Sequence, residues 1–251
     1  MLGAGGLLLA GAAHAQAAKP NVIVIYTDDH GTLDVNCFGA PDLYTPNMDA
    51  LAESGVRFTQ FYAAPVSSAS RACLMTGQFA RHAGLTGNAG LTGLRPEKET
   101  IAERMKAAGY RTACIGKWHL GSRPEYAPNN QGFDYFWGFL GGCIDSYSHF
   151  YYWAGPNVHD LWRNGQEIHY EGKFFTAETL REAKEFIREG DKRTPFFLYW
   201  AVNIPITRCN PRKNGSSTTR NCRIRGACTP HSFPRSTITW ASCVPSSRHR
   251  D

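Results

Sequence analysis

The sequence predicts an α/β fold in which a mostly parallel β-sheet is flanked by helices. The first observation is the β-branched run at 21–26, which has the length and composition of a buried strand. A second apolar run covers 195–203, and helix-like and strand-like segments alternate between the two runs. Because alternation without internal repeats favours parallel strands joined by helices, we expect helices on both faces of the sheet.

The intervening segments carry recognisable helix and strand signals. Thr45 and Pro46 are typical of a helix start, and Gly55 of its end. Thr100 and Glu103 form the pattern of a capping box, which predicts a second helix start. In chain order, the remaining predictions are a strand at 56–62, a helix from near 70 to before 84, a strand at 111–115, a structural turn at 130–138 and a helix at 175–190.

Length and composition divide the chain into three parts. With 251 residues and 42% hydrophobic content, the chain can bury a substantial core. We predict a signal peptide at 1–15, a folded domain at 20–205 and a basic tail at 206–251. The leader combines an apolar run, too short to span a bilayer, with a small-residue cleavage motif. These features predict a periplasmic or secreted protein without a membrane span; the alternative is an uncleaved N-terminal arm.

The basic charge lies in the tail, whose eight arginines, one lysine and single acidic residue sum to +8, so the rest of the chain is at −2 and the whole at +6. A nucleic-acid partner is therefore not expected for the folded domain. Beyond Pro205 the composition changes to Arg, Ser, Thr, Pro and Cys without any apolar period. We interpret this change as a frameshift, since codons read one base earlier permit a histidine followed by an amphipathic helix. The alternative is a genuine disordered basic tail.

A serine and an arginine stand where a turn enters a helix. Ser67 and Arg71 are four residues apart within the segment 65–77. The free N–H groups at a helix N-terminus favour a bound anion, and the planar arginine fork suits a tetrahedral oxyanion. This pattern makes Ser67 a candidate oxygen nucleophile; the simple alternative is an ordinary helix cap.

Two further groups of polar residues follow predicted strands. Asp28 and Asp29 come directly after the first strand, where open α/β sheets place ligands, and their carboxylates suit Ca²⁺ or Mg²⁺. Lys117 and His119 follow the strand at 111–115, and two-residue spacing lets both side chains reach one site. The alternatives are a solvated turn for the acids, and a surface lysine with a packed histidine.

The segment 139–170 is rich in tyrosine, tryptophan and histidine, and we expect it to face the substrate. Aromatic side chains suit sugar rings or aryl groups. Asp145 and His149 are the candidate substrate contacts in this segment, and plain packing is the alternative for each.

Taken together, the motifs resemble those of the type I sulfatases, of the alkaline phosphatase superfamily. The first motif is Ser-x-Ala-x-Arg-x-x-Leu-x-Thr-Gly, beginning at Ser67, with Ala69 where the family more often has proline. The second is Gly-Tyr-x-Thr, beginning at Gly109, followed by Gly-Lys-Trp-His, beginning at Gly116. The resemblance covers residues 20–205 and implies the N-terminal part of an alkaline phosphatase/sulfatase-like domain.

The resemblance also implies roles for these residues. Ser67 would be oxidised to 3-oxoalanine (formylglycine) by a serine-type maturase and would act as the nucleophile. Arg71, Lys117 and His119 would be catalytic. Asp28, Asp29 and Ser67 would bind the metal, Ca²⁺ with Mg²⁺ as the alternative.

The implied activity is that of an arylsulfatase-like enzyme, which hydrolyses the sulfuric ester bond of a sulfated small molecule or glycan. The family's later metal ligands have no counterpart in the sequence, so we expect the chain as written to be incomplete and weakly active or inactive. Two alternatives stay open. One is a phosphoesterase of the same superfamily that uses unmodified Ser67. The other is a truncated product without catalytic function.

Overall fold

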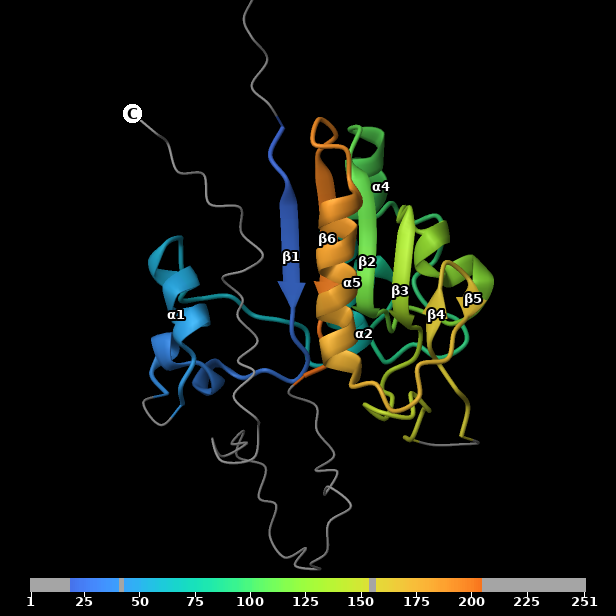
Figure 1. The fold of residues 1–251 in the computed structure, drawn as a ribbon, viewed down its shortest axis with the longest axis horizontal. Helices are drawn as coiled ribbons and strands as arrows, with labels where there is room; N and C mark the ends of the chain where they lie inside the picture. Colours follow the sequence, from blue (N-terminus) through green and yellow to red (C-terminus); the bar gives the residue numbers. More distant parts are fainter. Residues whose placement is uncertain (1–18, 41–42, 154–156, 205–251) are drawn as a thin grey trace, which may run out of the picture.

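The structure is a computed structural model that describes residues 19–40, 43–153 and 157–204. It consists of one twisted sheet with helices on both faces (Figure 1). The predicted leader at 1–15 and the predicted tail at 206–251, with its frameshift interpretation, lie outside the described residues. Within the described ranges, no helix has the length and hydrophobicity needed to cross a membrane.

The sheet confirms the predicted α/β class. Its six strands lie in the order β1 (Val22–Tyr26), β6 (Phe196–Ala201), β2 (Arg111–Lys117), β3 (Tyr135–Phe139), β4 (Trp162–Arg163) and β5 (Gln166–Glu167). The first four are parallel to one another, whereas β4 is antiparallel to β3 and forms an antiparallel hairpin with β5. The apolar strand β6 lies between β1 and β2, and β1 is the outer strand on its side among the residues that the structure describes. The sequence did not predict the β4–β5 hairpin.

Three main helices cover the two faces of the sheet. In Figure 1, α5 (Phe175–Glu189) crosses in front of the strands, and α2 (Ser67–Thr76) and α4 (Ile101–Ala107) lie behind. Successive side chains of a strand point to opposite faces. Accordingly, Tyr199 belongs to the core cluster that includes Met75 of α2, and Trp200 belongs to the cluster that includes Phe186 of α5.

The remaining helical segments are short and peripheral. They are η1 (Thr32–Asp34), η2 (Asn36–Phe38), α1 (Pro46–Glu53), α3 (Ala80–Ala83), η3 (Pro124–Tyr126) and η4 (Pro128–Asn130). In Figure 1, α1 lies beyond β1, to the side of the sheet.

The helix predicted from near 70 to before 84 is wrong in its bounds. The first helix, α2, already begins at Ser67 and ends at Thr76, and α3 is separate from it. Gly77 stops α2 because it adopts a left-handed conformation, with φ of 66°, which side chains other than glycine disfavour. The early start of α2 matters because it places Ser67 in the first turn of the helix.

The predicted strand at 56–62 is also wrong. These residues form no strand, and their alternating side chains are largely solvent-exposed: Val56 by 84%, Phe58 by 68%, Phe61 by 78% and Tyr62 by 83%. Alternation produces a strand only where a neighbouring strand accepts its hydrogen bonds, and none of the described strands pairs with this segment.

Of the two predicted helix caps, the one at Thr100 is confirmed, and the one at Thr45 makes no capping hydrogen bond. At the start of α4, the hydroxyl of Thr100 accepts a hydrogen bond from Glu103 N at 3.2 Å, and the Glu103 carboxylate accepts one from Thr100 N, so the capping box is confirmed. At the start of α1, Thr45 makes no capping bond, because its hydroxyl contacts Asn36 and Asp49 instead. The predicted turn at 130–138 is only partly a turn, because its last residues form β3.

A glycine at the end of β2 lets the strands meet closely beside the candidate site. Gly116 has φ of 112°, and a Cβ there would lie 2.0 Å from the carbonyl oxygen of Ala201 in β6. Only glycine fits this close approach. It brings the end of β2, and therefore Lys117, against the end of β6.

Candidate active site

The candidate catalytic residues meet at the carboxyl edge of the parallel strands. Asp28 follows β1, Lys117 ends β2, and Ser67 opens α2. Because β1 and β2 run parallel on either side of β6, their carboxyl ends point to the same edge. The structure brings Asp28, Ser67, Arg71, Lys117 and His119 into one hydrogen-bonded cluster.

The hydroxyl of Ser67 lies between two basic side chains. It accepts a hydrogen bond from Nε of Arg71 at 3.1 Å, and it lies 3.0 Å from Nδ1 of His119. The residue in the N-cap position of α2 is Val66, and it makes no side-chain capping bond. Ser67 is therefore not an ordinary cap: its hydroxyl points to Arg71 and His119.

A buried carboxylate holds the two cations of the site. Asp28 Oδ1 lies 3.3 Å from Nη2 of Arg71, and Asp28 Oδ2 accepts a hydrogen bond from Nζ of Lys117. All three side chains are almost completely buried. Arg71 Nη1 additionally donates to the Tyr199 hydroxyl at 2.9 Å and to the Lys117 carbonyl at 3.0 Å. Buried charges persist only when paired and hydrogen-bonded, so these bonds also fix the arginine fork in place.

The protonation states follow from burial and from the neighbouring charges. Burial opposes the charge on Arg71, but Tyr199 and Asp28 outweigh burial and raise the pKa of Arg71 above its ordinary value. Burial, together with the charge of Arg71, lowers the pKa of Lys117. Burial and the positive charges of Lys117 and Arg71 lower the pKa of His119 to about 3. The imidazole next to Ser67 is therefore neutral near pH 7.

Three of the candidate residues have unusual backbone conformations. Asp29, His119 and His149 have φ of 52°, 55° and 62°, in the left-handed region that residues with a Cβ rarely adopt. His119 is held there because its N–H donates to the Leu140 carbonyl at 3.1 Å and its carbonyl accepts from the Ser68 hydroxyl at 2.6 Å. Strained backbone of this kind clusters at functional sites.

Several supporting residues were not predicted from the sequence. Tyr199 looks like a core residue of β6, and Ser68 like a helix residue, until their partners Arg71 and His119 are known. Gly142 packs against the imidazole of His119, since a Cβ at this position would lie 2.8 Å from Cε1 of that ring. Their sequence context contains no signal for these contacts, which depend on the tertiary fold.

Asp145 and His149 lie together in a turn of the aromatic segment. One oxygen of Asp145 accepts hydrogen bonds from the Tyr147 and Ser148 amides at 3.0 and 2.8 Å. His149 is fully buried, and its Nε2 lies 3.1 Å from the Lys173 carbonyl. These bonds shape the turn, and contact with substrate stays a prediction for both residues.

The predicted metal ligands form only part of a calcium site. Calcium takes about six to eight oxygen ligands. Asp28, Asp29 and Ser67 offer carboxylate and hydroxyl oxygens, but both oxygens of Asp28 already face Arg71 or Lys117. Among the residues that the structure describes, these donors alone would leave calcium under-coordinated.

The fold and the buried cluster at its carboxyl edge are those of the N-terminal part of an alkaline-phosphatase-like α/β domain. The family model for sulfatases matches residues 20–205, and the chain belongs to the sulfatase family. It is 35% identical over 228 residues to an arylsulfatase of Klebsiella aerogenes, covering 82% of the chain and 47% of that relative. It is 36% identical over 191 residues to an N-acetylglucosamine-6-O-sulfatase of Bacteroides thetaiotaomicron, covering 76% of the chain and 31% of that relative.

Solved structures give the same assignment. The crystal structure of Ps i-CgsB in complex with k-i-k-neocarrahexaose superposes with a TM-score of 0.70 at 36% identity, covering 76% of the chain and 46% of that structure. The structure of BT4656 with D-glucosamine-2-N,6-O-disulfate superposes with a TM-score of 0.62 at 34% identity, covering 74% of the chain and 34% of that structure. The chain thus spans less than half the length of these relatives.

Proposed function

We propose that the protein is a sulfuric ester hydrolase whose nucleophile is formed from Ser67. The observation that carries this proposal is the position of the Ser67 hydroxyl, 3.1 Å from Arg71 Nε and 3.0 Å from His119 Nδ1. An oxygen nucleophile flanked by a fixed cation and a neutral imidazole suits attack on a tetrahedral anion. Membership of the sulfatase family supports sulfate over other anions.

The chemistry we propose uses Ser67 after oxidation to formylglycine, by a serine-type maturase, and hydration of the aldehyde. One geminal hydroxyl attacks sulfur, an oxygen–sulfur bond forms, and the ester bond breaks to release the alcohol. Removal of the proton from the second hydroxyl then breaks the carbon–oxygen bond, which expels sulfate and restores the aldehyde. A plain serine sulfate would lack this exit.

The neighbouring residues have separate roles in this proposal. Arg71 and Lys117, held by Asp28, bind the sulfate oxygens and stabilise the charge that develops on them. His119, neutral near pH 7, holds a hydroxyl of the nucleophile and accepts its proton. Asp28, Asp29 and Ser67 would contribute oxygen ligands to Ca²⁺, with Mg²⁺ as the alternative, and ligands from outside the described residues would have to complete that site.

We infer that the substrate is a sulfated glycan or a small aryl sulfate. Two solved relatives are complexes with k-i-k-neocarrahexaose and with D-glucosamine-2-N,6-O-disulfate, which supports the glycan. The aromatic segment 139–170, with Asp145 and His149, is the proposed source of substrate contacts. A periplasmic or secreted location fits an enzyme that acts on such polymers.

We propose separately that the chain as written has little or no sulfatase activity. Because the described residues provide an incomplete metal site, we expect weak or no turnover unless the ligands are supplied from elsewhere. A version restored to the shifted reading frame beyond residue 205 would then be active. The truncated product without catalytic function, predicted as an alternative, corresponds to a chain that is inactive as written.

The test is to express both versions with a serine-type maturase and to measure intact mass and aryl sulfate hydrolysis. Oxidation makes the chain lighter by two hydrogen atoms, and a matched Ser67→Ala variant must lack this change. Mass loss with sulfatase activity in the restored version supports the proposal. Phosphate ester hydrolysis by an unoxidised chain would instead favour the phosphoesterase. An oxidised, restored chain that hydrolyses neither aryl nor glycan sulfates would refute the proposed activity.

A further inference from the structure

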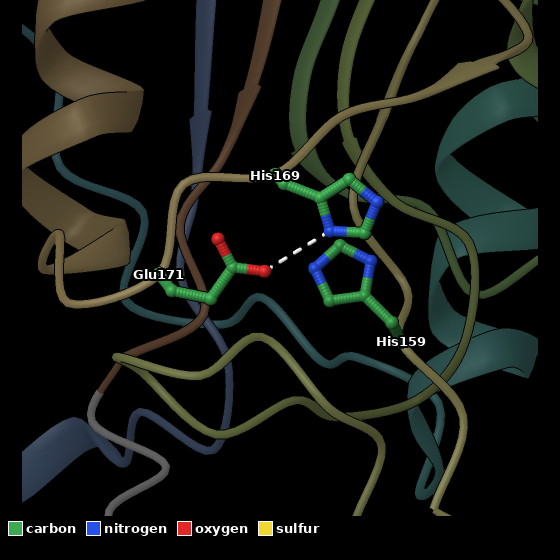
Figure 2. A group of neighbouring side chains, drawn as sticks. All are labelled: His159, His169 and Glu171. Atoms are coloured by element: carbon green, nitrogen blue, oxygen red, sulfur yellow. Dashed lines mark hydrogen bonds and ion pairs between the residues drawn. The ribbon is translucent and has the colours of Figure 1, made fainter.

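The ends of the β4–β5 hairpin carry a second group of polar side chains, separate from the Ser67 cluster. His159 lies just before β4, and His169 and Glu171 lie just after β5. Figure 2 shows that the three side chains converge on one point. One ligand atom from each lies within 4.8 Å of the ligand atoms of the other two. We propose that His159, His169 and Glu171 bind a divalent transition metal ion of the Zn²⁺ type.

The state of His159 is the strongest support for this site. Its side chain is only 7% exposed, and its Nε2 has no hydrogen-bond partner in the structure. Buried polar atoms normally have a partner, so an unpaired ring nitrogen calls for a ligand. Figure 2 shows this nitrogen on the side of the ring that faces Glu171.

The other ring nitrogen of His159 has the partner that a metal ligand requires. Nδ1 lies 2.9 Å from a carboxylate oxygen of Glu167 in β5. A hydrogen bond from Nδ1–H to this carboxylate fixes the tautomer, so that Nε2 carries the free electron pair. Metal-ligating histidines typically have such a carboxylate on the second nitrogen, where it orients the ring and increases its basicity.

His169 and Glu171 supply the remaining ligands from the surface. The rings of His159 and His169 are stacked, with centroids 4.5 Å apart and 22° between their planes. Nδ1 of His169 lies 3.0 Å from an oxygen of Glu171, so these two groups are already adjacent. Their side chains are 60% and 57% exposed, and they can rotate inward to the ligand spacing of about 3.3 Å that tetrahedral Zn²⁺ bond lengths imply.

The ligand types select the class of metal. Two imidazoles and one carboxylate suit Zn²⁺ and related transition metals, whereas Ca²⁺ and Mg²⁺ prefer oxygen ligands alone. Three protein ligands leave a fourth position for water. The bound ion would join the two arms of the hairpin, because His159 belongs to one arm and His169 and Glu171 to the other.

The test uses the whole chain with excess Ca²⁺, titrated with Zn²⁺ by calorimetry and with Co²⁺ by visible absorption. Histidine and carboxylate ligation gives Co²⁺ d–d bands without the near-ultraviolet charge-transfer band of thiolates, which separates this site from any cysteine site. We expect one binding event that His169→Ala and Glu171→Gln each weaken by at least about tenfold. Glu167→Gln should weaken it by about tenfold, the usual effect of removing a histidine's carboxylate partner.

Two controls keep the result specific. His82→Ala removes an exposed histidine elsewhere, and Ser67→Ala alters the catalytic cluster; neither should change this binding event. Because the side chains of His169 and Glu171 are exposed, their variants should keep the far-ultraviolet circular dichroism of the parent. Equal Zn²⁺ affinity in the parent, His169→Ala and Glu171→Gln would overturn the proposal, and so would the absence of thiolate-free Co²⁺ bands.

Discussion

Nε of Arg71 donates a 3.1 Å hydrogen bond to the hydroxyl of Ser67, one turn earlier on the same helix. The same guanidinium contacts Asp28, Tyr199 and the carbonyl of Lys117. Arg71 therefore joins α2 to the ends of β1, β2 and β6, and its removal should be felt well beyond the serine.

Arg71→Met tests this structural role. The substitution keeps an apolar stem but leaves the buried Asp28 with one cation fewer, so we expect a loss of about 3–5 kcal/mol in the free energy of unfolding. Urea denaturation followed by circular dichroism measures it. The matched control is Arg81→Met, at an exposed position, which should stay within about 0.5 kcal/mol of the parent. Equal stability of both variants would show that the buried ion cluster is not formed.

Gly116→Ala tests the close approach at the end of β2. The new Cβ would lie 2.0 Å from the Ala201 carbonyl oxygen, at φ of 112°. Both the clash and the backbone conformation oppose folding, and we expect a loss of about 3 kcal/mol or more. Gly87→Ala is the control, because a Cβ there meets nothing within 4 Å. A thermal melt separates the two variants; a Gly116→Ala melting temperature equal to that of the control would contradict the packing described.

Thr100→Ala removes the cap of α4. The Thr100 hydroxyl accepts from Glu103 N and donates to the Gln131 carbonyl at 2.8 Å. We expect a loss of about 1–2 kcal/mol, the usual cost of a missing N-cap at the upper end of its range. Thr92→Ala, at an exposed loop position, is the matched control and should be nearly neutral. Chemical denaturation of both variants gives the comparison, and a neutral Thr100→Ala would mean that the capping box contributes nothing.

The lowered pKa of His149 predicts that the free energy of unfolding decreases at acid pH. Burial lowers its pKa below the ordinary value, with the Lys173 carbonyl, His159, Glu171 and Asp145 as neighbouring groups. As the pH falls below about 6.5, the unfolded chain binds a proton that folded His149 does not, so stability decreases toward acid pH. Above that pH both states are neutral and the contribution vanishes.

His149→Asn should remove this part of the pH dependence. Asparagine tolerates the left-handed backbone at position 149, where φ is 62°. We expect a shallower decrease in the free energy of unfolding between about pH 6.5 and 5 than in the parent. His119, whose pKa is also lowered, retains its own share of the slope in this variant. Identical slopes in the parent and His149→Asn would show that His149 titrates normally.

The site residues that follow strands could be predicted because topology decides where they lie. Asp28 and Lys117 each stand at the carboxyl end of a parallel strand, and such ends share one edge. Ser67 and Arg71 were predictable from their spacing on one helix. Tyr199 was not, because an inward-facing tyrosine on a core strand looks the same whether its hydroxyl meets a backbone carbonyl or a guanidinium.

The wrong or missed predictions concern features that a local sequence pattern does not determine. The segment 56–62 has the period of a strand, but hydrogen-bonding partners are a property of the whole fold and are not encoded in the segment itself. Conversely, the two-residue strands β4 and β5 are too short to show any period, although the ends of their hairpin carry His159, His169 and Glu171, the proposed metal ligands. The break at Gly77 was missed because one glycine in a helical pattern is compatible with continuation as well as with an end.

The strands at the two edges of the sheet differ in length, and this difference decides at which edge a further β-strand can pair. Within the described ranges, the margin at β5 ends in a two-residue strand, whereas β1 offers five residues of outer strand. An extended segment docking in parallel therefore finds a template of useful length at β1. The same template would direct self-association at high concentration. Ile25→Lys, at a side chain that is 38% exposed, would place a charge on this strand and oppose such pairing.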